Sequence, residues 1–84
     1  MHLEPEDTAA ITRRMKRAHG HLASVIRMLE EGADCEAALT QLAAVNKAIS
    51  RSGYALVSTG LQKCIVEGDE VDQAKLEKVF LALA

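Results

Sequence analysis

Apolar side chains in the first third of the chain repeat with the spacing of an amphipathic helix. They advance in steps of four, three, four, three and four, through Ile11, Met15, Ala18, Leu22, Val25 and Leu29. Such steps place the side chains on one stripe of a helix that packs against other helices. Pro5 suits the first turn of this helix, because its missing N–H group costs nothing there. We expect the helix to end near Gly32.

A second and longer helix is predicted from Cys35 to about Glu67. Asp34 has a side chain suited to cap its first turn, although Ala37 replaces the acidic residue of a complete capping box. Apolar residues lie on more than one side of this helix: Leu39, Leu42, Ala43, Ile49, Leu56, Leu61 and Ile65. Gly53 and Gly60 are expected weak points within it.

A break is predicted at Gly68, Asp69 and Glu70, followed by a short third helix. Leu76, Val79, Phe80 and Leu83 form its apolar stripe. Residues 1–84 are therefore expected to form a single all-α domain, with three helices and a long middle helix. A chain of 84 residues buries little surface alone, so we expect it to oligomerise.

The distribution of charge is more informative than the formal net charge of −2. Residues 8–29 and 37–66 contain no acidic side chain, and the first of these segments carries Arg13, Arg14, Lys16 and Arg17, here called the cationic cluster. With Arg51 on the second helix, these side chains can bind the phosphates of DNA. A solvated helix face is the other interpretation. Base stacking is not expected, since Tyr54 and Phe80 are the only aromatic residues.

The two cysteines point to thiol chemistry in a reducing compartment. No secretory signal or membrane-length apolar run is present, so a cytoplasmic protein without membrane contact is expected. Cys35 and Cys64 are 29 residues apart, which on one helix is about 43 Å with an angular offset of only about 20°. The two thiols cannot meet within one chain, but both face the same side of the helix.

An antiparallel pair of these helices, related by a two-fold axis between Ile49 and Ser50, would place Cys35 of one chain beside Cys64 of the other. Symmetric dimers are the commonest oligomers. The spacing thus predicts a thiol pair between subunits. The alternative interpretation is that Cys35 and Cys64 are ordinary small buried residues without a chemical role.

The segment "RRMKRAHGHLASVIRMLEEGADCEAALTQLAAVNKAISRSGYALVSTGLQKC", residues 13–64, resembles the CsoR/RcnR family of bacterial transcriptional repressors. The ordered blocks that carry the resemblance follow R-L-x-R-I-x-G-Q, R-M-I-E-E-G-x-x-C and L-x-Q-[IL]-A-A. His21 departs from the usual glutamine of the first block. The resemblance implies an all-helical homodimer, with antiparallel middle helices, that assembles into a homotetramer and releases operator DNA when an inducer binds. It also implies operator-binding roles for Arg14 and Arg51, flanked by Arg13, Lys16 and Arg17.

Copper sensors of this family use a Cys, His, Cys set, with the histidine four residues before the second cysteine. The cysteines correspond to Cys35 and Cys64, and Gly60 takes the place of the histidine. A trigonal copper site would lack one ligand. The pattern is most similar to the CstR-like branch, which senses persulfide and other reactive sulfur species by a thiol switch. The resemblance to that branch implies that Cys35 and Cys64 become joined by a di-, tri- or tetrasulfide, with room left by Gly60.

Three other functions are considered beside the sulfur sensor: a copper-responsive repressor, a structural adaptor and an enzyme. Two thiolates can bind Cu(I) linearly, so a copper-responsive repressor with Cys35 and Cys64 as ligands stays open. A structural helical adaptor with inert cysteines is the candidate from another class. An enzyme is not expected, because no acid–base constellation is present, and neither is a resident cofactor. His2, His19 and His21 are expected at the surface rather than in a metal site.

Overall fold

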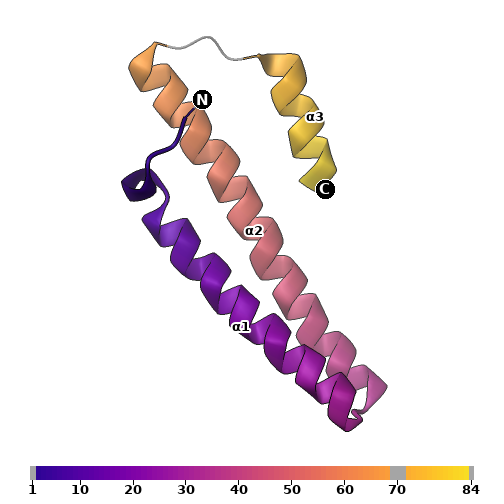
Figure 1. Cartoon of the computed structure of the whole chain (residues 1–84). Coiled ribbons are helices and arrows are strands. Elements are labelled where there is room, and N and C mark those ends of the chain that lie inside the picture. The colour runs from indigo at the N-terminus through magenta and orange to yellow at the C-terminus, as the bar shows by residue number, and fades with distance from the viewer. Residues whose placement is uncertain (1, 69–71, 84) are drawn as a thin grey trace.

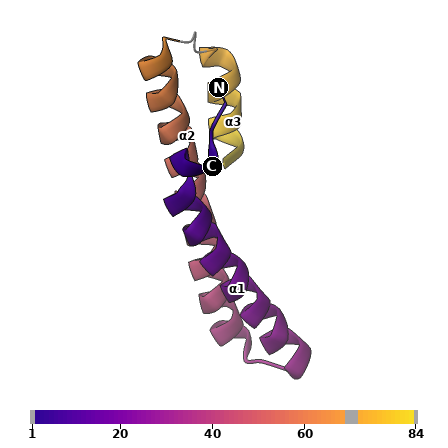
Figure 2. The same ribbon diagram turned by 60° about the vertical axis from the view of Figure 1, so that its left-hand side comes forward.

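The computed structural model describes residues 2–68 and 72–83 as an elongated helical unit measuring 52 × 26 × 14 Å. A short 3₁₀ helix η1 (Pro5–Asp7) precedes α1 (Ala9–Glu31), α2 (Cys35–Glu67) and α3 (Gln73–Leu83). Helices α1 and α2 form an antiparallel hairpin, and α3 folds back along the C-terminal half of α2 (Figure 1). In a second view the start of the chain overlies α3 (Figure 2), and Leu3 lies near residues of both α2 and α3. The predicted three-helix, all-α architecture with a long middle helix is confirmed.

The predicted ends of the helices agree with the structure, apart from the start of the first. Gly32 has φ 85° and follows α1, and Gly68 is in the left-handed conformation with φ 73° and follows α2. Asp34 accepts a hydrogen bond from the backbone N–H of Ala37 at 3.0 Å, as an N-cap does. Asp69 and Glu70, the other residues of the predicted break, lie outside the described residues.

Pro5 opens η1 rather than the first α-helix. The backbone of Thr8 (φ −118°, ψ 10°) departs from helical values, so η1 does not continue into α1. The carboxylate of Asp7 accepts the backbone N–H of Glu4 at 2.9 Å, which closes this small turn upon itself. Residues 2–8 therefore form a separate N-terminal segment.

The core of the hairpin consists of two buried stripes with a seven-residue step. On α1 these residues are Ile11, Ala18 and Val25, and on α2 they are Ala38, Val45 and Ser52. His21 and Gln41 join the two helices by a side-chain hydrogen bond of 2.6 Å. This register places the buried residues level in antiparallel order, as the layers Ile11–Ser52, Ala18–Val45 and Val25–Ala38. Ser52 donates to the carbonyl of Ala48 at 3.0 Å, so its buried hydroxyl is satisfied.

Only half of the predicted stripe on α1 is buried in the single chain. Met15 is 48% exposed and Leu29 is 62% exposed, and Leu22 is half-buried. Residues spaced by seven on α1 and α2 form a narrow seam between the two helices. The apolar face of α1 is wider than this seam, so α2 alone cannot cover both of its edges.

Gly53 allows close packing between α2 and α3. A Cβ at this position would lie 2.9 Å from Cδ2 of Leu83, closer than van der Waals contact permits. Nearby, the rings of Tyr54 and Phe80 lie 5.3 Å apart with a tilt of 44°, a favourable aromatic arrangement. Helix α2 continues without interruption through both Gly53 and Gly60.

A row of large apolar side chains on α2 is uncovered, here called the exposed α2 stripe. It comprises Leu39, Leu42, Ile49 and Leu56, which are 59%, 45%, 46% and 38% exposed. Their steps of three, seven and seven place them along one side of the helix. An apolar row of this length on a small protein marks an interaction surface. None of the helices among residues 2–68 and 72–83 has a stretch long and apolar enough to cross a membrane.

Candidate functional site

The two cysteines lie at opposite ends of α2 and in different environments. Cys35 is the first residue of the helix and is exposed, whereas Cys64 is in its last turns and is 1% exposed. Because the helix between them is unbroken, the spacing of about 43 Å applies and the thiols cannot meet within one chain. The sequence did not reveal this difference in exposure, because the periodicity of one helix does not show which of its residues other segments cover.

Cys35 borders a groove where the end of α1 meets the start of α2. The groove has a volume of about 350 Å³ and is lined otherwise by apolar residues: Val25, Leu29, Ala33, Ala38, Leu39 and Leu42. We call it the Cys35 groove. The thiol of Cys35 is therefore exposed to solvent on one side and lies beside apolar side chains on the other.

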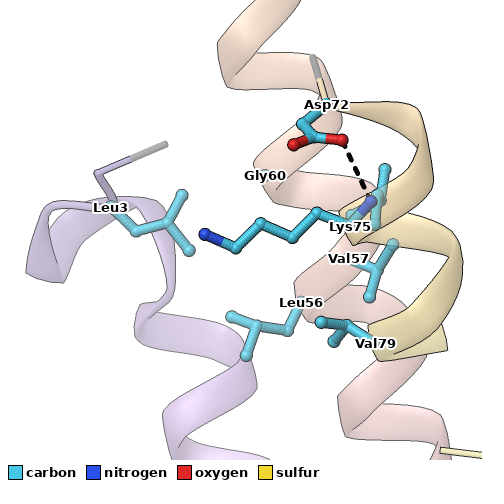
Figure 3. A pocket seen from close by; sticks show the side chains of 8 residues that line it. Leu3, Leu56, Val57, Gly60, Asp72, Lys75 and Val79 are labelled. Carbon is cyan, nitrogen blue, oxygen red and sulfur yellow. Dashed lines mark hydrogen bonds between the residues drawn. The ribbon is translucent and has the colours of Figure 1, made fainter. Parts of the chain in front are cut away.

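Gly60 lies one turn before Cys64, is buried and borders a second hollow, here called the Gly60 cavity. This cavity has a volume of about 260 Å³ and lies between α2, α3 and the N-terminal segment (Figure 3). Leu3, Leu56, Val57, Asp72, Lys75, Leu76 and Val79 complete its lining. The glycine offers no donor atom. Among residues 2–68 and 72–83, no group of three or more His, Cys, Asp or Glu side chains is arranged to hold a metal ion.

An ion pair ties the N-terminal segment to α2 beside Cys64. The ammonium group of Lys63 contacts the carboxylate of Asp7 at the protein surface, and their side chains are 20% and 29% exposed. The hydrogen bond from Lys63 lowers the pKa of Asp7, and the backbone N–H of Glu4 lowers it further. The same hydrogen bond raises the pKa of Lys63. Glu67, one turn along α2, approaches Lys63 less closely, at 3.8 Å.

No sequence signal pointed to this contact. Residues 7 and 63 are 56 positions apart, and periodicity describes neighbours on one helix rather than partners across a fold.

The cationic cluster occupies the exposed surface of α1. Arg13, Lys16 and Arg17 line a shallow hollow together, and Arg14 is exposed beside them. Arg51 is exposed on α2, and the His21–Gln41 register places it level with the first turns of α1. Within residues 2–68 and 72–83, the salt bridges involve only His2, Glu4, Asp7, Lys63 and Glu67. The five predicted DNA-binding cations are therefore not neutralised by any described carboxylate.

The three histidines are separate from the cysteines. His2 lies 3.2 Å from Glu4 with its side chain 83% exposed, and His19 is exposed. His21 is half-buried and bonded to Gln41, so it fixes the register of the hairpin.

Comparison with known proteins identifies the family. The family model described as "Metal-sensitive transcriptional repressor" matches residues 7–84. The chain belongs to this family. Its members are transcriptional repressors rather than enzymes, which agrees with the resemblance to the CsoR/RcnR family noted from the ordered blocks.

Individual relatives extend the comparison. The copper-sensing transcriptional repressor CsoR of Mycobacterium ulcerans is 38% identical over 55 residues, covering 66% of this chain and 47% of that protein. The protein of the same name from Mycobacterium tuberculosis is 30% identical over 76 residues, covering 88% and 64%. The uncharacterized protein YrkD of Bacillus subtilis is 46% identical over 43 residues, covering 51% and 68%. The chain thus spans about half to two thirds of the length of the copper-sensing relatives. No solved structure matches it significantly.

The Asp7–Lys63 ion pair predicts that the stability of the fold falls at both low and high pH. Because the pKa of Asp7 is lowered in the folded chain, its contribution is present above the ordinary value of 3.8 and is lost as the pH falls through the lower folded pKa. Because the pKa of Lys63 is raised, its contribution is present below 10.5 and is lost as the pH rises through the higher folded pKa. Asp7→Asn should therefore lower the melting temperature at pH 7, and the difference from wild type should shrink as the pH falls below 3.8.

Thermal unfolding followed by circular dichroism, at one protein concentration, measures this. Glu67→Gln is the matched control and should change the melting temperature little, since its contact is longer and Glu67 is more exposed. If Asp7→Asn lowers the melting temperature by the same amount at pH 7 and at pH 2, the ion pair does not contribute to the stability of the fold.

Proposed function

We propose that the protein is a DNA-binding transcriptional repressor that senses sulfane sulfur. Its sensor is the thiol of Cys35 with that of Cys64 from a second copy, and its working form is a homodimer that assembles further into a homotetramer. The observation that carries the sensor is the set of chemical groups at the two ends of α2: two thiols, and a buried glycine one turn before the second.

The exposed α2 stripe supports the dimer. Ile49 lies near the midpoint between the two cysteines, so an antiparallel pair of α2 helices that crosses there covers the stripe in both copies. The same arrangement brings Cys35 beside Cys64 of the second copy, twice per dimer. It also places Leu39 opposite Gly60 and Leu42 opposite Val57. The Cys35 groove of one copy therefore meets the Gly60 cavity of the other.

The difference in exposure between the thiols suggests the order of reaction. Cys35 is accessible, so its thiolate attacks the terminal sulfur of a hydropersulfide R–S–SH. The S–S bond of the donor breaks, the thiolate R–S⁻ leaves with the bonding electron pair, and Cys35 becomes the persulfide Cys–S–SH. The shielded Cys64 of the second copy is the resolving thiol.

The second step joins the two subunits. The thiolate of Cys64 attacks the inner sulfur of the Cys35 persulfide, a disulfide forms, and HS⁻ leaves with the bonding electrons. Where Cys64 also carries a persulfide, the same displacement yields a trisulfide and HS⁻. Each further sulfane sulfur taken from a donor lengthens the bridge by one atom. A histidine side chain at position 60 would lie beside the proposed bridge, at the edge of the Gly60 cavity, whereas glycine adds no side chain there.

The cationic cluster and Arg51 are the proposed DNA-binding surface. They are exposed and are not paired with any described carboxylate, so they are available to neutralise phosphates. Cross-linking at the ends of α2 would restrain the subunits relative to each other, and hence the spacing between the cationic surfaces of the dimer.

A Cu(I)-responsive repressor is the second candidate, because relatives that match 66% and 88% of this chain are named copper-sensing. Cys35 and Cys64 of the second copy supply two thiolates, which suffice for linear Cu(I) coordination. Because Gly60 has no side-chain donor, a Cu(I) site with three protein ligands is disfavoured. A Cu(I) site with two thiolate ligands is compatible with the residues present. An inert adaptor remains the candidate from outside this class.

The choice between sulfur and copper can be tested on reduced protein without oxygen. We expect sodium tetrasulfide to release the protein from a DNA fragment that contains its own promoter region, measured by fluorescence anisotropy. Intact mass should show covalent dimers whose masses step by one sulfur atom. Cys35→Ser and Cys64→Ser should keep DNA binding and lose the cross-link. Release by Cu(I) without any reaction with tetrasulfide would favour the copper candidate, and absence of DNA binding in every state would favour the adaptor.

Replacing Gly60 should shift the site toward copper. Gly60→His places an imidazole one turn before Cys64, at the edge of the Gly60 cavity, and supplies the missing third donor. We expect the affinity for Cu(I), measured by competition with a chelator, to rise at least tenfold, and cross-linking by tetrasulfide to slow. Gly60→Ala is the control, since it adds a methyl group without a donor and should leave the Cu(I) affinity unchanged. Equal Cu(I) affinities in the three proteins would contradict the role assigned to this position.

Removing a cation from the proposed DNA-binding surface should weaken binding without abolishing the fold. Arg14→Ala is expected to lower DNA affinity about tenfold and to reduce the slope of log affinity against log salt by about one. Arg27→Ala is the matched control on the same helix, because Arg27 lies near its other end, where it bonds Ser24 at 3.0 Å. Equal losses in the two variants would show that general charge, rather than this surface, determines binding.

A further inference from the structure

The Gly60 cavity has more capacity than a bridge of sulfur atoms requires. Five of its lining residues have hydrocarbon side chains, contributed by three separate segments: Leu3, Leu56, Val57, Leu76 and Val79. At about 260 Å³ it is close to the lower limit of cavities that hold small organic ligands. Burying a hydrocarbon group against these side chains is favourable because it removes apolar surface from water.

The polar groups of this cavity come from the first turn of α3. Figure 3 shows the Lys75 side chain extending from α3 toward Leu3, so that its hydrocarbon stem lines the cavity and its ammonium group lies at the far end. Among the described lining residues, Asp72 is the only acidic one, and its Oδ1 accepts the backbone N–H of Lys75 at 3.0 Å. The described lining therefore combines a hydrocarbon interior with the ammonium group of Lys75 and, at the start of α3, the carboxylate of Asp72.

We propose that the Gly60 cavity binds the organic part of the sulfur donor, and that the donor is a small alkyl persulfide with a carboxylate group. This inference rests on the proposed function. The alkyl chain lies among Leu56, Val57 and Val79, and the carboxylate accepts a charge-assisted hydrogen bond from Lys75. The hydropersulfide end points to the mouth near Gly60, where the dimer brings Cys35 of the second copy.

Bound in this way, the donor is oriented for the first displacement. The Cys35 thiolate forms a bond to the terminal sulfur, the S–S bond of the donor breaks, and the alkyl thiolate leaves with the electron pair. The alkyl thiolate keeps the carboxylate and the carbon chain that fit the cavity. An inorganic polysulfide has neither group, so it reacts at the same thiols without using Lys75.

Three donors separate these contributions in the full-length reduced protein: the persulfide of 3-mercaptopropionic acid, the persulfide of 1-propanethiol, and sodium tetrasulfide. Initial rates of cross-linking are measured by intact mass over a range of donor concentrations. We expect Lys75→Met to slow the reaction with the carboxylated persulfide about tenfold, the scale of one lost charge-assisted hydrogen bond. The rates with propyl persulfide and tetrasulfide should change less than twofold.

Two further variants serve as controls. Lys75→Glu should slow the carboxylated donor more than Lys75→Met does, while keeping the fold, since Asp72 and a glutamate three residues later form a capping box. Lys78→Glu makes the same charge change on exposed α3 outside the cavity and should leave all three rates unchanged.

The outcomes distinguish this inference from the proposed function. If wild-type protein reacts with all three donors and Lys75→Met reacts as wild type does, the cavity does not recognise the carboxylate and the inference is wrong, while the sulfur sensor stands. Equal slowing with all three donors would likewise overturn it, because Lys75 would then act on the thiols in general. If none of the donors cross-links wild-type subunits, the proposed function itself fails.

Discussion

The continuity of α2 is the constraint on which the rest of the structure depends. A helix of 33 residues is rigid over its length, so it holds Cys35 and Cys64 at opposite ends of the molecule. Three separate surfaces share this one helix: a buried stripe against α1, a C-terminal part against α3, and the exposed α2 stripe. Two of them are filled by the same chain. The third is largely exposed in the single chain, although Leu56 at one end also borders the Gly60 cavity, and the two thiols lie beyond its ends.

This division of surfaces links assembly to chemistry. Small buried residues (Ala18, Ala38 and Ser52) bring α1 and α2 close together but contribute little apolar area. Much of the large hydrocarbon surface of the chain, including Leu39, Leu42 and Ile49, lies on the uncovered side instead. A second copy that covers this side adds the burial that the single chain lacks. The proposed pairing that satisfies this need would also complete the thiol pair, so in that assembly sensing and stability would depend on the same interface.

The N-terminal segment and α3 give the two ends of α2 different properties. Cys35 stands at a helix start beside an open apolar groove, whereas Cys64 is shielded and adjoins the Asp7–Lys63 ion pair. Leu3 from the N-terminal segment and Val79 from α3 enclose the cavity beside Gly60 (Figure 3). A pair of chemically identical residues thereby acquires two roles, the attacking thiol and the resolving thiol of the proposed sensor.

The sequence by itself determined the three α-helices and their ends, apart from the start of the first, because caps and periodicity act over a few residues. Asp34, Gly32 and Gly68 mark boundaries through local backbone geometry, and the structure places them there. Family membership was also readable from ordered blocks. Only the tertiary structure decided that η1 is separate from α1, that Met15 and Leu29 are exposed, that Cys64 is shielded while Cys35 is not, and that a cavity adjoins Gly60. These features depend on contacts between segments such as residues 7 and 63, and pairings at that separation leave no periodic trace along the chain.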